Sequence, residues 1–123
     1  MSQKTKIFAL LLLFLLPIIA IASPKREVRA VWLTTIGGLD WPHSYAYAGK
    51  GVERQKAELC SLLDKYQKAG INTVLLQTRV RGTVIYPSAY EPWDGCLSGH
   101  PGTSPGYDAL AYAVEQCHNR GME

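Results

Sequence analysis

The amino-acid sequence predicts an α/β fold in which strands and helices alternate in the order β-α-β-α. A continuous apolar run, TVLL at 73–76, is typical of a parallel strand that is buried on both faces. An amphipathic segment, 53–69, comes directly before it and ends at Gly70, a residue type that commonly follows a helix. Because a helix between two strands is the usual parallel crossover, this arrangement predicts a parallel sheet.

Residues 1–22 have the pattern of a secretory signal peptide. Lys4 and Lys6 form a basic start, an apolar stretch follows, and Ala-Ile-Ala at 20–22 is a small-x-small cleavage site. We therefore expect an exported protein, periplasmic or secreted, with 23–123 as its mature chain. A retained anchor is the alternative, but the apolar stretch has only 16 residues, and a membrane-spanning helix needs roughly 20. No stable membrane anchor is expected after cleavage.

The charge balance argues against a nucleic-acid partner. Once Lys4 and Lys6 are removed with the signal, eleven basic residues stand against ten acidic ones. The mature chain shows no basic patch of the kind that binds nucleic acid. His43 has no second ligand at metal-binding spacing, so neither a metal ion nor another cofactor is expected.

Three cysteines are an odd number for a chain that is expected to be exported. Cys60 and Cys117 fall among apolar residues of predicted helices, which favours small core side chains over a disulfide. Cys96 falls in a predicted loop, where it is either a free thiol or a partner for another chain.

The first strand is predicted over 28–35 (VRAVWLTT), which is rich in β-branched and aromatic residues and is followed by a glycine pair. Alternation puts Trp32 on the face opposite Leu33. Trp32 either packs there, which is favoured, or forms a platform for a sugar. The next loop, 36–51, carries aromatic residues that either stack on a ligand or fold back over the structure; they are Trp41, Tyr45 and Tyr47.

Two helices are predicted. The first, 53–69, has an apolar stripe at positions i, i+3, i+4 and i+7, formed by Leu59, Leu62, Leu63 and Tyr66. The second, 108–120, starts after Asp108 as N-cap and stops at Gly121. Met122 and Glu123 would begin a third strand.

An unusually long loop, 80–106, connects the second strand to the second helix. Loops of more than about 12–15 residues usually have a functional role or are disordered. This one is too rich in aromatic residues and proline for a disordered linker. We expect an ordered loop over a site, because α/β proteins hold their sites at the carboxyl ends of the strands.

Two strand-helix units leave two sheet edges unpaired and one sheet face uncovered. We therefore expect 23–123 to be the amino-terminal β-α-β-α portion of an incomplete (β/α)8 TIM barrel, truncated before the third strand; a complete barrel takes about 250 residues. An open doubly wound sheet is the alternative. The first strand-helix turn lacks the G-x-G-x-x-G signature, so dinucleotide binding is not expected.

Five stretches form a pattern that covers nearly all of the mature chain. They are REVRAVWLTT (26–35), AGINTVLLQTRVRG (69–82), IYPSAYEPW (85–93), LSG (97–99) and PGYDALAYAVEQCHNRGME (105–123). In this order they resemble the glycosyl hydrolase-like 10 family of exported bacterial proteins. The resemblance implies a TIM barrel related to retaining glycosidases and hydrolysis of O-glycosyl bonds. The implied partner is a polysaccharide or a peptidoglycan-type cell-wall glycan.

Glycoside hydrolysis needs two carboxyl groups, about 5–5.5 Å apart for retention or about 6.5–9.5 Å apart for inversion. In related barrels these groups stand at the ends of the fourth and seventh strands, so the resemblance places the acid/base and the nucleophile downstream of residue 123. Their identity is unknown, and this chain alone is expected to be inactive. A non-catalytic carbohydrate-binding barrel and a non-functional truncated remnant are the alternatives.

The candidate substrate-binding residues all follow the second strand, and they are Gln77, Arg79, Arg81, Tyr86, Glu91 and Trp93. Gln77 and Arg79 share the parity of the second strand, so both are expected to project toward the barrel mouth. The guanidinium groups of Arg79 and Arg81 either bind sugar hydroxyls or carboxylates, or pair with acids of the loops, Asp40, Glu91 or Asp94. Tyr86 and Trp93 either stack on sugar rings or fill the core of the loop.

Overall fold

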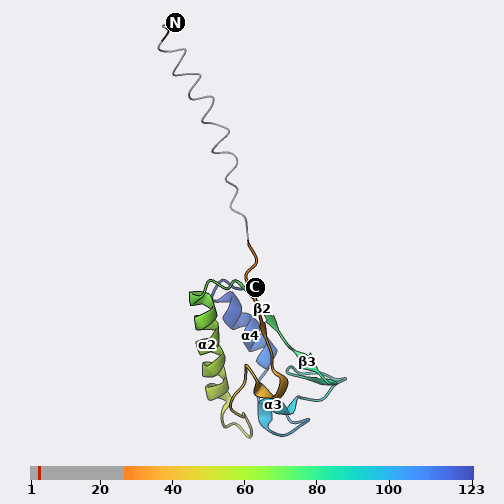
Figure 1. Ribbon diagram of the computed structural model, residues 1–123. Helices are drawn as coiled ribbons and strands as arrows, with labels where there is room; N and C mark the ends of the chain where they lie inside the picture. The colour runs from red at the N-terminus through yellow and green to blue at the C-terminus, as the bar shows by residue number, and fades with distance from the viewer. Residues whose placement is uncertain (1–2, 4–26) are drawn as a thin grey trace.

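The computed structural model describes residue 3 and residues 27–123 (Figure 1). Apart from residue 3, the predicted signal peptide lies outside the described residues and remains a prediction. The elements are, in chain order, β1 (Ala30–Leu33), the 3-10 turn η1 (Ile36–Gly38), α2 (Val52–Lys68), β2 (Thr73–Leu76), β3 (Arg79–Val80), β4 (Thr83–Val84), α3 (Gly95–Ser98) and α4 (Ala109–His118). The predicted β-α-β-α alternation is confirmed, with additional short elements between β2 and α4. Within 27–123 no helix is long and apolar enough to cross a membrane.

Strands β1 and β2 are parallel, and Ala30 lies opposite Thr73. The first strand is shorter than the predicted 28–35. It ends at Leu33 because the next residues bond elsewhere: the Thr34 amide donates to the Asp40 carboxylate at 2.9 Å, and the Thr35 amide donates to a side chain that follows β2. The two strands nonetheless confirm the parallel sheet.

Glu123 pairs with β2 in the manner of a third parallel strand. Its amide donates to the Asn72 carbonyl at 2.9 Å, and its carbonyl accepts from the Val74 amide at 2.7 Å. Two bonds that flank one residue of the neighbouring strand, here Thr73, are the pattern of a parallel ladder. These bonds are the ones expected where a parallel strand begins, although within the described residues this sheet consists of β1 and β2 alone.

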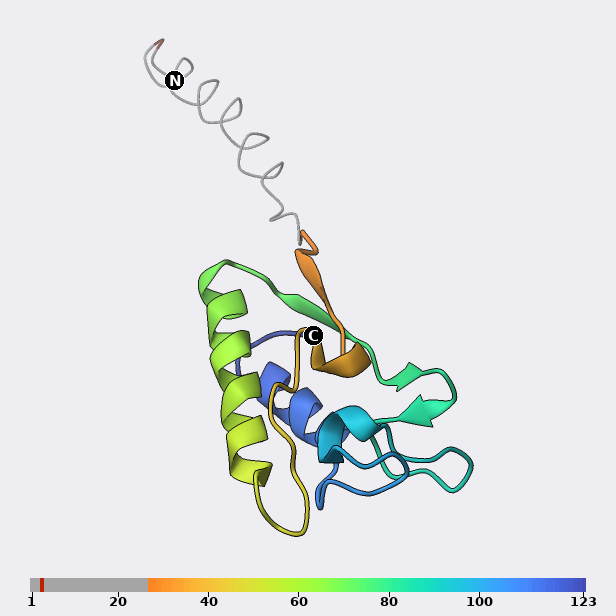
Figure 2. The ribbon, with the colours of Figure 1, turned by 60° about the horizontal axis from the view of Figure 1, so that its bottom comes forward.

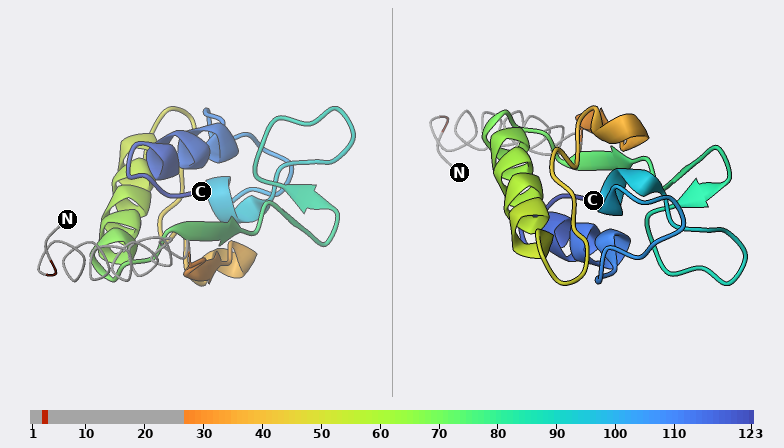
Figure 3. Two further views of the ribbon diagram at one scale, coloured as in Figure 1. Left: turned by 90° about the horizontal axis from the view of Figure 1, so that it is seen from above. Right: turned by 90° about the horizontal axis from the view of Figure 1, so that it is seen from below.

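Helices α2 and α4 lie side by side on one face of the β1–β2 sheet (Figures 1 and 3). The core between the two layers is formed by residues of β1, α2 and α4, among them Leu33, Leu59, Leu63, Ala113 and Cys117. Leu62 and Tyr66 pack against this core and are partly buried, so the predicted stripe of α2 is confirmed.

The opposite face of the sheet is open in the described part of the chain. Trp32 is 63% exposed, and its partner across the ladder, Leu75, is 48% exposed. The expectation that Trp32 packs is therefore wrong for these residues. Helices cover only one face, and the alternation that buries Leu33 turns Trp32 away from them.

The segment between β2 and α4 is ordered, as expected, but it is not a single loop (Figure 2). It begins with the antiparallel hairpin β3–β4, whose two central residues, Arg81 and Gly82, have φ angles of 52° and 77°. It continues to α3, where the Asp94 carboxylate accepts the Cys96 amide at 2.8 Å as an N-cap.

The three cysteines are free thiols. Cys117 is a buried core residue, as predicted, whereas Cys60 is only partly buried and its sulfur lies 3.2 Å from the Tyr112 hydroxyl. The placement of Cys96 in a loop is wrong. It lies in α3 and is 8% exposed, because the cap at Asp94 starts a helical turn that turns Cys96 and Leu97 inward.

Candidate functional site

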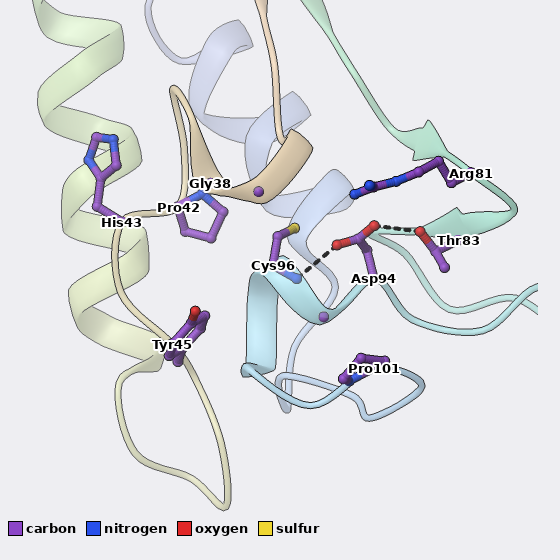
Figure 4. A pocket seen from close by; sticks show the side chains of 11 residues that line it. Gly38, Pro42, His43, Tyr45, Arg81, Thr83, Asp94, Cys96 and Pro101 are labelled. Carbon is purple, nitrogen blue, oxygen red and sulfur yellow. Dashed lines mark hydrogen bonds between the residues drawn. The ribbon is translucent and has the colours of Figure 1, made fainter.

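A pocket of about 570 Å3 lies where the segments that follow β1 and β2 meet. This is the carboxyl end of the parallel sheet, the expected place for a site. Its lining combines three glycines and two prolines with aromatic, hydroxyl, charged and thiol side chains (Figure 4): Gly37, Gly38, Pro42, His43, Tyr45, Arg81, Thr83, Asp94, Gly95, Cys96 and Pro101. The volume falls in the range of about 300–1,000 Å3 that is usual for small-ligand sites.

One buried side chain, Gln55 of α2, connects the loops that form the pocket. Its amide nitrogen donates to the Ser44 carbonyl at 2.5 Å and to the Leu97 carbonyl at 2.6 Å. Its side-chain oxygen accepts from the Tyr107 hydroxyl at 2.9 Å, and its backbone carbonyl accepts from the Trp41 indole, also at 2.9 Å. The loop after β1, α3 and the start of α4 are thereby held together.

The loop aromatic residues after β1 have divided roles. Trp41 is 1% exposed and folds back over α2, whereas Tyr45 and Tyr47 are 67% and 49% exposed. Tyr45 lines the pocket, and Tyr47 stacks at a tilt on His100, with ring centres 4.5 Å apart. Of these three aromatic residues, Trp41 is therefore the one that folds back over the structure, whereas Tyr45 and Tyr47 stay exposed.

Asp94 is the carboxylate of the pocket wall, and both of its oxygens are engaged. One accepts the Cys96 amide, and the other accepts the Thr83 hydroxyl. Burial raises the pKa of Asp94, but these hydrogen bonds and the charge of Arg81 outweigh burial and hold the pKa below its ordinary value. Asp94 is therefore a fixed anion at neutral pH.

Cys96 lines the same pocket without the properties of a nucleophile. Burial, together with the neighbouring Asp94 carboxylate, raises the pKa of its thiol to about 12. The thiol is protonated at neutral pH. In the described part of the chain no group of three or more His, Cys, Asp and Glu residues is placed to hold a metal ion.

Gln77 lies at the end of β2, where its side-chain oxygen is fully engaged within the protein. It accepts from the Thr34 hydroxyl at 2.5 Å, from the Thr35 amide at 3.1 Å and from the Ile36 amide at 3.2 Å. Gln77 therefore connects the ends of β1 and β2 through hydrogen bonds, and it lies outside the lining of the pocket.

The two predicted arginines lie in different surroundings. Arg79 on β3 grips Glu91 with two nitrogens, and its Nε lies 2.7 Å from one carboxylate oxygen and 2.9 Å from the other. Arg79 and Glu91, both named as ligand contacts, thus contact each other. Arg81 lines the pocket and makes no ion pair or side-chain hydrogen bond with any residue of 27–123.

The two predicted aromatic contacts lie outside the pocket lining. Trp93 is partly buried and packs against the hydrophobic core, while Tyr86 is partly exposed near Arg79. Of the six predicted residues, only Arg81 lines the pocket. The sequence reasoning missed Thr83 and Asp94 as pocket residues, and it left Tyr45 open between stacking on a ligand and folding back. For Asp94 the available signal was its N-cap position before a short apolar run.

The chain is similar to proteins named as glycosyl hydrolases. It is 43% identical over 107 residues to glycosyl hydrolase YngK of Bacillus subtilis, and this alignment covers 87% of this chain and 20% of that protein. It is 36% identical over 103 residues to glycosyl hydrolase DigH of Escherichia coli K12, covering 80% of this chain and 24% of that protein. The chain thus spans about a fifth to a quarter of the length of these curated relatives.

The family comparison covers residues 27–123. The model of the family "Glycosyl hydrolase-like 10" matches residues 27–123, which include both parallel strands, the helices α2 and α4 and every residue that lines the pocket. A match over more than half of the chain agrees with the resemblance found in the sequence, and the chain belongs to the glycosyl hydrolase-like 10 family.

Proposed function

We propose that this chain is part of an exported glycoside hydrolase that acts on a polysaccharide or cell-wall glycan, including glycans of the peptidoglycan type. The observation that carries the proposal is the family match over 27–123 together with relatives that are named glycosyl hydrolases. The signal-like pattern of 1–22 supports export. The polar and aromatic pocket at the strand ends supports a sugar ligand.

The parallel strands and the helices fit the first part of a (β/α)8 barrel. In such a barrel the helices cover the outer face of the strands, and the inner face is filled by side chains of the other strands. The open face that carries Trp32 and Leu75 corresponds to that interior. Glu123, which pairs with the free edge of β2, corresponds to the start of the third strand.

In this proposal the chain contributes substrate binding, and the catalytic carboxyl groups belong to other parts of the whole protein. Hydrolysis needs a pair of carboxyl groups, one of which has a raised pKa so that it can act as the acid. Asp94 has a lowered pKa, and its oxygens are engaged by Thr83 and Cys96. Asp94 therefore shapes the pocket wall and does not serve as the acid.

The whole protein should release new reducing ends from a glycan that it accepts. Purified soluble polysaccharides and purified cell-wall glycan strands would be incubated with the protein, and reducing ends would be counted. Saturable binding without any release would contradict hydrolysis and would assign the protein to the non-catalytic carbohydrate-binding class. Export has its own test: protein recovered from outside the cytoplasm should begin at Ser23.

The pocket can be tested with two matched variants. Tyr45→Ala removes an aromatic ring that lines the pocket, whereas Tyr90→Ala removes a ring that is 96% exposed and outside it. We expect the KM for the glycan to rise several-fold in Tyr45→Ala, since stacking is lost, and to stay unchanged in Tyr90→Ala. Equal effects of the two substitutions would show that this pocket is not where the glycan binds.

A further inference from the structure

Arg81 adopts a backbone conformation that an arginine rarely adopts. Its φ angle is 52°, and the next residue, Gly82, has a φ angle of 77°, so the hairpin turn has two positive φ angles in succession. Such primed turns prefer asparagine or glycine at their first central position. The left-handed conformation costs most other residues about 1–2 kcal/mol. An unfavourable residue that persists at such a position points to a role for its side chain.

The guanidinium group of Arg81 is available to a ligand. Each of the four other arginines in 27–123 lies within 4.0 Å of a carboxylate; these pairs are Arg29 with Glu27, Arg54 with Glu58, Arg79 with Glu91, and Arg120 with Asp64. Arg81 has no such pair within the same range of residues. Figure 4 shows its side chain extended over the pocket, toward Asp94 and the turn that carries Gly38.

The carboxylate nearest in the wall, that of Asp94, does not use the hydrogen-bonding capacity of Arg81. Its two oxygens accept from Thr83 and from the Cys96 amide. The opposite charges of Asp94 and Arg81 still attract each other, and this attraction contributes to the lowered pKa of Asp94. No residue of 27–123 occupies the donors of the planar fork. A fork of this kind matches a carboxylate with two parallel hydrogen bonds.

The rest of the lining suits a sugar ring better than a bare ion. Tyr45, Pro42 and Pro101 supply apolar surfaces against which the C–H faces of a ring can pack. Gly37 and Gly38 have no side chain, and a Cβ added to either would meet no atom within 4 Å, so the backbone of η1 leaves open space on that side. The cavity of about 570 Å3 exceeds what a small anion needs.

We propose that Arg81 forms a subsite for the carboxylate of an acidic sugar unit, with the ring of that sugar in the pocket between Tyr45 and η1. This inference rests on the proposed function in that the ligand is a glycan, and it narrows the substrate class to glycans that carry carboxylate groups. Arg79 holds Glu91 and does not form this subsite.

The test compares glucuronate with glucose as probes for the whole protein, with binding measured by calorimetry or ligand-observed NMR. One charge-assisted bidentate contact at an exposed site should make glucuronate bind about tenfold more tightly than glucose. Arg81→Asn should abolish this preference and should keep or raise the melting temperature, because asparagine suits the turn. Arg81→Lys should keep part of the preference. Arg54→Asn, which removes the same charge from α2, should keep all of it.

Several results would overturn the subsite. They are a wild-type protein without preference for glucuronate, an Arg81→Asn variant that retains the preference, and acetate that binds as tightly as glucuronate, which would indicate a general anion site. The release of reducing ends is measured separately. Hydrolysis without a carboxylate preference refutes the subsite alone, whereas a preference that depends on Arg81 without hydrolysis refutes catalysis alone.

Discussion

The substitution Gln55→Leu should loosen the pocket without creating a cavity. Leucine nearly matches the volume of glutamine, but it cannot donate to the carbonyls of Ser44 and Leu97 or accept from the Tyr107 hydroxyl. Gln55 has no exposed surface, so water cannot replace these bonds in the folded state. The loop after β1 and the segment before α4 would therefore lose their common anchor.

The size of the effect follows from the partners left behind. The Leu97 carbonyl keeps a second donor, the Ala46 amide at 2.8 Å, so its loss is small. The Ser44 carbonyl and the partly buried Tyr107 hydroxyl lose their partner, and each buried unsatisfied group costs about 1–3 kcal/mol. The gain from burying an apolar side chain offsets part of this cost. We expect a net destabilisation of about 2–3 kcal/mol, a large part of the total of about 5–15 kcal/mol for a domain.

Hydrogen exchange of the whole protein provides a local measurement, which avoids assuming a single unfolding transition for a long chain. The Ala46 amide, which donates to Leu97, should exchange roughly 30- to 150-fold faster in Gln55→Leu, since about 1.4 kcal/mol corresponds to tenfold. The control is Gln67→Leu on the same helix, which removes one exposed bond to the Arg120 carbonyl and should change exchange less than about fivefold. Protection of Ala46 that is equal in Gln55→Leu and wild type would refute the anchoring role.

Three further predictions concern the pocket wall and the hairpin. The Asp94 pKa is lowered in the folded state, so the ionised carboxylate stabilises the fold above its unfolded pKa of about 3.9. This contribution is lost as the pH falls through the folded pKa. Asp94→Asn should therefore lower the melting temperature at pH 7, and its difference from wild type should shrink below pH 4. Cys96, with a thiol pKa of about 12, should resist iodoacetamide at pH 8 until the protein is unfolded, and rapid labelling of the native protein would contradict its burial. Arg79→Ala should leave the melting temperature nearly unchanged, because exposed ion pairs contribute little to stability. It should also weaken glycan binding less than Arg81→Asn does. If Arg79→Ala weakened binding more than Arg81→Asn, Arg79 would be a direct ligand contact.

The elements that could be predicted are those in which several local signals agree. Helix α2 has an apolar stripe over about two turns, from Leu59 to Tyr66, and its end is marked by Gly70. Helix α4 starts where Asp108 accepts the Ala111 amide at 2.9 Å, the bond expected from an N-cap. The parallel pairing of β1 and β2 followed from the helix between them, since the connection itself dictates the direction of the second strand.

The elements that could not be predicted are shorter than any periodic pattern. Strands β3 and β4 have two residues each and α3 has four, so neither a period of two nor one of 3.6 can be recognised in them. Their turn is also hidden, because Arg-Gly lacks the asparagine or aspartate that usually marks a primed turn. As a result Cys96 was assigned to a loop although it lies in a buried helical turn.

Gln77 and Arg79 share the parity of β2 but lie outside the pocket lining, whereas Arg81 lines the pocket. This difference has a physical cause. Parity holds only while a strand continues, and β2 ends at Leu76. Beyond that point the side chains are directed by local partners: Gln77 by three donors at the end of β1, and Arg79 by Glu91. Arg81 is directed by its turn, whose positive φ angle points the side chain over the pocket without an internal partner. A residue with a defined direction and no partner within the described fold is the one best prepared to bind a ligand.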